Sequence, residues 1–124
     1  MKIYIASNSS HRIELRRNEL PHLVNLGHEI TSTWITDDAH IDGGMGQKES
    51  AIVDLQDIDR ADAILLMVDQ FGPRPGKGKY VELGYAVAKE KKIFLCGFDT
   101  GCVFYHLPQC IRVRSLNDIP LICE

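Results

Sequence analysis

The sequence has no long apolar segment and no excess of basic residues. Its longest apolar runs, such as residues 63–68, are far shorter than the ~20 residues that a membrane-spanning helix needs. The N-terminus has no extended apolar region of the signal-peptide kind. Lys and Arg number 14 against 17 Asp and Glu, so no basic field attracts a nucleic acid backbone. We therefore expect a cytoplasmic protein that binds neither a membrane nor a nucleic acid polymer.

The sequence also lacks the usual spacings of metal and disulfide sites. The four cysteines form no C-x-x-C pair, and no two of the five histidines stand at H-x-x-x-H spacing. Free cysteine commonly behaves as a small buried hydrophobe, so we expect no metal and no cofactor. The composition, with 44% hydrophobic and 25% charged residues, is that of one globular domain, which we place at residues 1–124.

Hydrophobic patterning divides the chain into alternating strands and helices. We expect strands at residues 2–6, 28–35, 63–68, 93–98 and 111–113, and helices at about 10–27, 47–61 and 80–92. Within the first helix, Pro21 predicts a second helical segment or a kink. Residues 36–46 and 70–79 are rich in Asp, Gly or Pro and are expected to be loops. This order predicts an α/β fold with a flavodoxin-like, doubly wound parallel sheet of five strands.

In such sheets, ligands bind outside the carboxyl ends of the strands, near the point where the strand order reverses. Three segments of this chain are predicted to meet there. They are the turn after the first strand (7–12), the loop after the third strand (69–79) and the start of the helix that carries Glu82.

Glu82 is expected in the first turn of its helix, after a glycine-rich loop. A stripe of Val81, Gly84, Tyr85 and Ala88 is predicted to pack on the sheet, which leaves the carboxylate partly buried. The helix N-terminus favours its ionised form, and an ionised, partly desolvated carboxylate is suited to nucleophilic attack. The alternative is a glutamate that only complements the helix dipole.

Asp54 lies on the border of the apolar stripe of its helix, whereas Asp57 is predicted to project outward. We expect Asp57 and Asp59 to be solvated. Asp54 could equally be a surface charge. If it faces the same cleft as Glu82, the two carboxyls supply a nucleophile and a proton donor for breaking a glycosidic bond in two steps.

Further polar residues follow the first strand. Hydroxyls, an amide and a guanidinium are offered there by Ser7, Asn8, Ser9 and Arg12, in a place suited to a phosphate, a sugar or a base. Plain helix capping is the alternative for this segment. Trp34, the only tryptophan, is a candidate to stack on a planar base or to be buried in the core.

The glycine-rich loop does not match a phosphate-binding loop of the G-x-x-x-x-G-K-[ST] type. Gly72 and Gly76 have three residues between them, and Lys77 is followed by Gly78. We assign Gly76 and Gly78 to substrate binding. Basic side chains that could contact an anionic group, or could simply be solvated, are Arg74, Lys77 and Lys79.

Three segments resemble the nucleoside 2-deoxyribosyltransferase family, including its relatives that hydrolyse deoxynucleoside monophosphates. The segments are IYIASNS (3–9), DLQDIDRADAILLMVD (54–69) and GKYVELGYAVAKEKKIFL (78–95). The resemblance implies that Glu82 is the nucleophile, that Asp54 transfers a proton to the base and that Tyr4 hydrogen-bonds the nucleophile. It also implies a homodimer or a larger homo-oligomer. The chain departs from the family at Gly76, where some members have Asp or Ser.

The reaction expected from this resemblance is attack of Glu82 on C1′ of a 2′-deoxynucleoside, followed by transfer of the deoxyribosyl group to another base. A first alternative is hydrolysis of deoxynucleoside 5′-monophosphates by an N-glycosidase. A second is a nucleotide-binding module without turnover, because doubly wound sheets host many functions.

Overall fold

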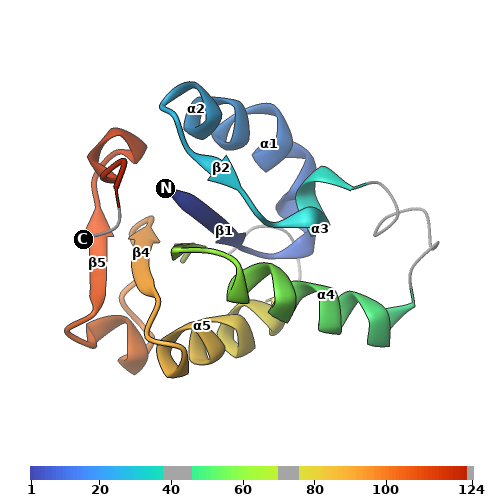
Figure 1. The fold of residues 1–124 in the computed structure, drawn as a ribbon. Coiled ribbons are helices and arrows are strands. Elements are labelled where there is room, and N and C mark those ends of the chain that lie inside the picture. The colour runs from blue at the N-terminus through green and yellow to red at the C-terminus, as the bar shows by residue number, and fades with distance from the viewer. Residues whose placement is uncertain (38–45, 70–75, 123–124) are drawn as a thin grey trace.

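A computed structural model describes residues 1–37, 46–69 and 76–122, and a parallel sheet forms its centre (Figure 1). The five strands are β1 (Lys2–Ala6), β2 (Glu29–Ile30), β3 (Ala63–Met67), β4 (Lys92–Cys96) and β5 (Cys110–Val113). Their order is β2-β1-β3-β4-β5, and neighbouring strands are parallel. This is the order of a flavodoxin-like doubly wound sheet, so the predicted fold class is confirmed.

Helices cover both sides of the sheet. They are α1 (Arg12–Arg17), α2 (Glu19–Asn25), α3 (Thr33–Thr36), α4 (Gln47–Asp59) and α5 (Gly78–Ala88), with 3-10 turns at Ser9–His11, Val103–His106 and Leu116–Asp118. Figure 1 shows α1 and α2 on one side of the sheet and α4 and α5 on the other. The break expected near Pro21 is confirmed, since α1 ends at Arg17 and a new helix contains the proline. None of the helices in the described ranges is long and apolar enough to cross a membrane.

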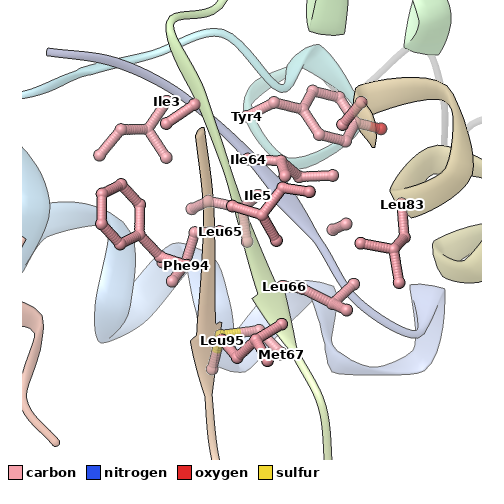
Figure 2. Close-up of a cluster of buried hydrophobic side chains, with 14 of the residues drawn as sticks. Ile3, Tyr4, Ile5, Ile64, Leu65, Leu66, Met67, Leu83, Phe94 and Leu95 are labelled. Carbon is pink, nitrogen blue, oxygen red and sulfur yellow. The ribbon is translucent and has the colours of Figure 1, made fainter. Parts of the chain in front are cut away.

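The central strands form the core. Ile3, Ile5 and Leu65 are fully buried, and no residue of β3 is more than 6% exposed. Figure 2 shows side chains of β1, β3 and β4 gathered into one cluster with Leu83 of α5. Strands covered on both sides are rigid, so the polar residues that follow β1 and β3 are held in fixed positions at the carboxyl edge.

The second strand is shorter than its sequence predicts. β-branched and aromatic residues predict one strand at 28–35, but β2 ends at Ile30 and α3 begins at Thr33. The prediction is wrong because side chains take over main-chain hydrogen bonds. Ser32 Oγ accepts the N–H of Ile5 at 3.2 Å, and the hydroxyl of Thr31 donates to the carbonyl of Asp57 at 2.9 Å. The chain therefore leaves the sheet early and turns into α3.

The helix predicted at 80–92 is shifted toward the N-terminus. It begins at Gly78 and ends at Ala88, and Lys92 already belongs to β4. Glu90 adopts a left-handed conformation with φ 58°, which ends the helix. The ammonium of Lys91 then donates to the carbonyl of Asp59 at the end of α4, at 2.8 Å, and to the carbonyl of Ala61 just after it, at 2.8 Å. The predicted bounds of this helix are therefore corrected at both ends.

The buried side of α5 also differs from the prediction. Val81 is 67% exposed, whereas Glu82, Leu83 and Ala86 are buried together with Lys79. The predicted stripe is wrong because it rests on apolar residues alone, and this helix buries two charged side chains. Because α5 begins at Gly78, Glu82 lies in its second turn, on the buried side of the helix.

Candidate active site

A cleft of about 600 Å³ lies at the carboxyl edge of the sheet, where α3, α4 and the start of α5 meet. The strands beside it, β1 and β3, are neighbours and lead into helices on opposite sides of the sheet, which is where the strand order reverses (Figure 1). Predicted site residues that line the cleft are Ser7, Ser9, Arg12, Trp34, Asp54, Gly76, Gly78 and Glu82. The three segments expected to meet at this edge therefore do so.

Tyr4 and Glu82 form the innermost contact of the site. Tyr4 is fully buried on β1, and its hydroxyl donates a hydrogen bond to Oε2 of Glu82. Figure 2 shows the Tyr4 ring extending from the strand toward α5. Burial and the neighbouring Glu82 carboxyl raise the pKa of Tyr4 far above its ordinary value, so the phenol stays protonated and remains a donor.

Glu82 has a raised pKa, in contrast to the ionised form expected from its helix. The side chain is 9% exposed, and burial raises its pKa to about 8, although the hydrogen bond from Tyr4 acts in the opposite direction. The prediction relied on the helix N-terminus, but Glu82 lies beyond the first turn, where the dipole has little effect. A glutamate that only complements the dipole does not fit this position.

Asp54 faces the cleft from α4 and is half-buried. Its Oδ1 is shielded from solvent and accepts no hydrogen bond from any residue that the structure describes. Burial, followed by the charge of Asp57, raises the pKa of Asp54 to about 6. An unsatisfied, buried carboxyl oxygen that faces a cleft is not an ordinary surface charge.

The two carboxyls influence one another across the cleft, since Asp54 contributes to the raised pKa of Glu82. With pKa values of about 6 and about 8, the pair holds one proton near neutral pH. These values place the shared proton mainly on Glu82, and its transfer to Asp54 gives the form of the pair with one nucleophilic carboxylate and one proton donor.

Asp57 corrects another expectation. It is only 4% exposed and accepts hydrogen bonds from Thr33 and Arg60, so the prediction of a solvated side chain is wrong. Its partner Thr33 lies 24 residues away in the sequence, and helical spacing within α4 carries no sign of it. Asp59 is half-exposed and accepts a hydrogen bond from the hydroxyl of Tyr85 at 2.7 Å.

Asn8 supports the cleft from outside it. Its Oδ1 accepts the N–H of Gly76 at 3.0 Å, and the side chain is 2% exposed. A Cβ atom at Gly76 would overlap this oxygen and would approach the Cα of Asn8 to 3.1 Å. Position 76 therefore takes glycine, and the amide of Asn8 occupies the space of a larger side chain there. Gly78 differs, because a Cβ at that position would meet no atom within 4 Å.

Arg12 and Trp34 form one wall of the cleft together. Arg12 is 6% exposed, and its Nε donates to the carbonyl of Trp34 at 2.7 Å. The indole N–H of Trp34 donates to the carbonyl of Ile5 at 2.8 Å. Trp34 packs in the core and also lines the cleft, so both interpretations of this residue hold in part.

The lysines of the cleft have different surroundings. Lys77 is exposed, whereas Lys79 is 3% exposed and its Nζ lies 3.3 Å from the carbonyl oxygen of Val68. Burial lowers the pKa of Lys79. Arg74 lies outside the described residues. Within the described ranges, no three His, Cys, Asp or Glu side chains are grouped so that they could hold a metal ion.

The sheet order, the cleft at the reversal point and its two carboxyls define a flavodoxin-like α/β protein with two acidic side chains in its cleft. The model of one family, nucleoside 2-deoxyribosyltransferase, matches residues 3–109. The chain belongs to the nucleoside 2-deoxyribosyltransferase family, as its three motif segments predict.

A solved structure also resembles this chain, the CMP N-glycosidase BcmB of Clostridium botulinum. The two share 16% sequence identity with a TM-score of 0.60, over 94% of this chain and 92% of that chain. No curated protein matches the sequence. The family and this structural neighbour are enzymes that transfer a glycosyl group or cleave an N-glycosidic bond.

Proposed function

We propose that this protein cleaves the N-glycosidic bond of 2′-deoxynucleosides and transfers the deoxyribosyl group to another base. The observation that carries the proposal is the pair of cleft-lining carboxyls, with Glu82 held by Tyr4 and Asp54 placed on the other helix. Family membership supports the same reaction class.

In the first step, the Glu82 oxygen that Tyr4 does not bind attacks C1′ of the substrate. The bond from C1′ to the base breaks, its electron pair moves to the base, and Asp54 donates a proton to the base. The product on the enzyme is a deoxyribosyl ester of Glu82. Tyr4 holds the second carboxylate oxygen and so fixes the direction of attack.

In the second step, a nitrogen of the incoming base attacks C1′, and Asp54 takes up the proton that this base loses. The ester bond breaks, and its electron pair returns to Glu82. The pair of carboxyls then holds one proton again. A bell-shaped pH dependence of kcat/KM follows, with limbs near the pKa values of about 6 and about 8, because activity needs one proton on the pair.

The base is expected to bind beside Trp34. Its ring lines the cleft but stays anchored to Ile5, so it offers a rigid apolar surface to a planar base. Leu55 and Val81 add apolar contacts within the same cleft.

The decisive test incubates the protein with a panel of deoxynucleosides and free bases and separates the products by chromatography. New deoxynucleosides would support transfer. Release of free base alone would support hydrolysis. If neither product formed from any deoxynucleoside or its monophosphate, the enzymatic assignment would be wrong.

Hydrolysis of deoxynucleoside 5′-monophosphates is the second candidate, and the basic residues of the cleft favour it. Arg12, Lys77 and Lys79 all line the cleft, and Arg or Lys contacts to phosphate are strong because they are charge-assisted. Lys77→Ala would then reduce turnover of the monophosphate much more than turnover of the nucleoside. Equal losses on both substrates would remove this candidate.

A homo-oligomer belongs to the same proposal. Tyr80 of α5 and Phe104 of the 3-10 turn Val103–His106 line one shared pocket. Apolar side chains exposed on these two segments are Tyr80 (42%), Val81 (67%), Val103 (74%) and Phe104 (59%). Apolar side chains gathered in this way are typical of protein interfaces. Light scattering after gel filtration checks the mass, and a monomeric, fully active protein would contradict the oligomer.

A further inference from the structure

Asp57 is the most thoroughly bonded carboxylate among the described residues, and the reaction above gives it no role. It lies one helical turn after Asp54 on α4, at 4% exposure. Its Oδ2 accepts the main-chain N–H of Thr33 at 3.0 Å and the hydroxyl of the same residue at 2.6 Å. Its Oδ1 accepts two N–H groups of Arg60, at 3.2 and 3.1 Å.

The contacts of Asp57 join two walls of the cleft. Thr33 is the first residue of α3, and the next residue is Trp34, which lines the cleft. Arg60 strengthens the same junction, because its Nη2 also donates to the carbonyl of Thr31 at 2.7 Å. The helix that carries Asp54 is therefore joined to the short helix that carries Trp34 by hydrogen bonds and by the ion pair of Asp57 with Arg60.

The charge of Asp57 also acts on the cleft. The charged or titratable groups around Asp54 are Asp57 on the same helix, Glu82 on α5 and Tyr4 on β1. The basic residues that line the same cleft are Arg12, Lys77 and Lys79. Of these, Asp57 is the group whose charge raises the pKa of Asp54, after burial itself. Arg60 forms an ion pair with Asp57 at 3.1 Å, and its side chain is 51% exposed and therefore screened by solvent.

We propose that Asp57 is a positioning residue of this active site, which holds Asp54 and Trp34 in register across the cleft and places its own negative charge beside Asp54. The proposal deepens the proposed function and rests on it, since Asp54 is the proton donor there. Asp57 contacts no substrate itself and acts through Thr33 and through its charge.

The test compares two variants that change the charge beside Asp54 in opposite directions. Asp57→Asn removes a negative charge and keeps an oxygen that can accept from Thr33. Arg60→Gln removes the compensating positive charge and leaves Asp57 in place. NMR titration of the carboxyl carbon of Asp54, assigned by its loss in Asp54→Asn, measures the result without reference to catalysis.

Asp57→Asn is expected to lower the titration midpoint of Asp54 by roughly one pH unit, the size typical of one nearby charge. Arg60→Gln is expected to raise it by a smaller amount. Asp59→Asn is the matched control, because Asp59 lies on the same helix and bonds Tyr85, and the midpoint should not move. A role in stability alone predicts no shift, or shifts of one sign in both variants, and either result would overturn the proposal.

If Asp57→Asn does not fold, Arg60→Gln decides alone, with an upward shift in support and an unchanged midpoint against. A second readout is the pH dependence of kcat/KM, which should move to lower pH in Asp57→Asn and to higher pH in Arg60→Gln. If the unaltered protein turned over no deoxynucleoside, the proposed function would fall, while the NMR titration would still decide whether Asp57 controls the proton on Asp54.

Discussion

Glu82 and Asp54 face the same cleft, but the two walls that carry them are built from different contacts. The wall of Glu82 is the apolar core itself, with α5 packed on β3 and β4 through Leu83 and Ala86. Among the described residues, the only hydrogen bond to the Glu82 side chain comes from the hydroxyl of Tyr4. The wall of Asp54 is polar, because α4 is joined to α3 through Asp57.

Under the proposed function, this difference separates two tasks. Bond formation at C1′ requires an oxygen at a fixed point, and we propose that close packing around α5 supplies that position. Proton transfer requires a controlled charge, and we propose that the polar junction supplies it through the charge of Asp57. Changes in the apolar wall should therefore act on the nucleophile, and changes in the polar wall on the proton.

Loss of the nucleophile is expected to have the largest effect. Glu82→Ala should reduce kcat by roughly 10⁴-fold or more, because no covalent ester can form. Steady-state kinetics with a deoxynucleoside and a second base measures this loss. Glu49→Ala is the matched control, since Glu49 is an exposed glutamate in the first turn of α4, and it should keep full activity.

The adduct gives a second check on the same residue. A 2′-fluorinated arabinosyl nucleoside slows breakdown of the intermediate, so peptide mass spectrometry should place the sugar on Glu82. A sugar found on Asp54 would mean that Asp54 is the nucleophile. A folded and active Glu82→Ala variant would mean that Glu82 is not.

Loss of the proton donor comes next. Asp54→Asn should reduce kcat by roughly 10²–10⁴-fold with natural bases, the range typical of general acid catalysis. With a substrate whose leaving group needs no proton, such as a nitrophenyl deoxyriboside, most of this loss should vanish. Equal losses on both kinds of substrate would show that Asp54 acts in another way.

Removal of the Tyr4 hydroxyl tests the apolar wall with a smaller change. Tyr4→Phe keeps the buried ring but removes the hydrogen bond that lowers the pKa of Glu82, so that pKa should rise above about 8. At neutral pH, kcat should fall by roughly 10-fold, since one pH unit changes the ionised fraction tenfold. The loss should shrink as the pH is raised, and a loss that is the same at every pH would contradict this role.

The sequence predicts the sheet well because buried parallel strands leave continuous apolar runs such as that of β3. It fails at β2, where Ser32 and Thr31 replace main-chain partners with their side chains. It also fails on the orientation of α5, because the apolar pattern places Val81 on the sheet and gives no sign that Lys79 is buried, although it does predict partial burial of Glu82. These errors lie next to the cleft, where local patterns and functional placement disagree.

The site residues divide in the same way. Glu82 is a candidate because it follows a glycine-rich loop near the start of a helix, Asp54 is a candidate because of its place in the helical pattern, and the family resemblance adds Tyr4. Asp57 could not be found, since its bond to Thr33 joins segments that are distant in the sequence. A carboxylate at the border of an apolar stripe has the same local sequence pattern whether it is exposed to solvent or contacts a neighbouring helix.

The last expected effect is on stability and not on turnover, and it arises in the apolar wall. In the unfolded chain, Glu82 has its ordinary pKa of 4.5, whereas in the folded protein burial raises the pKa to about 8. As the pH rises between these values, the unfolded state releases its proton before the folded state does, so the free energy of unfolding falls and then levels off above about pH 8.

Glu82→Gln cannot ionise and can still accept the hydrogen bond of Tyr4. It should therefore match the unaltered protein below pH 4.5 and exceed its free energy of unfolding by about 2–5 kcal/mol above pH 8. Urea unfolding across this pH range measures the difference, with Glu49→Gln as the control that should stay within about 0.5 kcal/mol at every pH. If the difference in the free energy of unfolding between Glu82→Gln and the unaltered protein were the same at pH 5 and at pH 9, the Glu82 carboxyl would not be shielded from water in the folded protein.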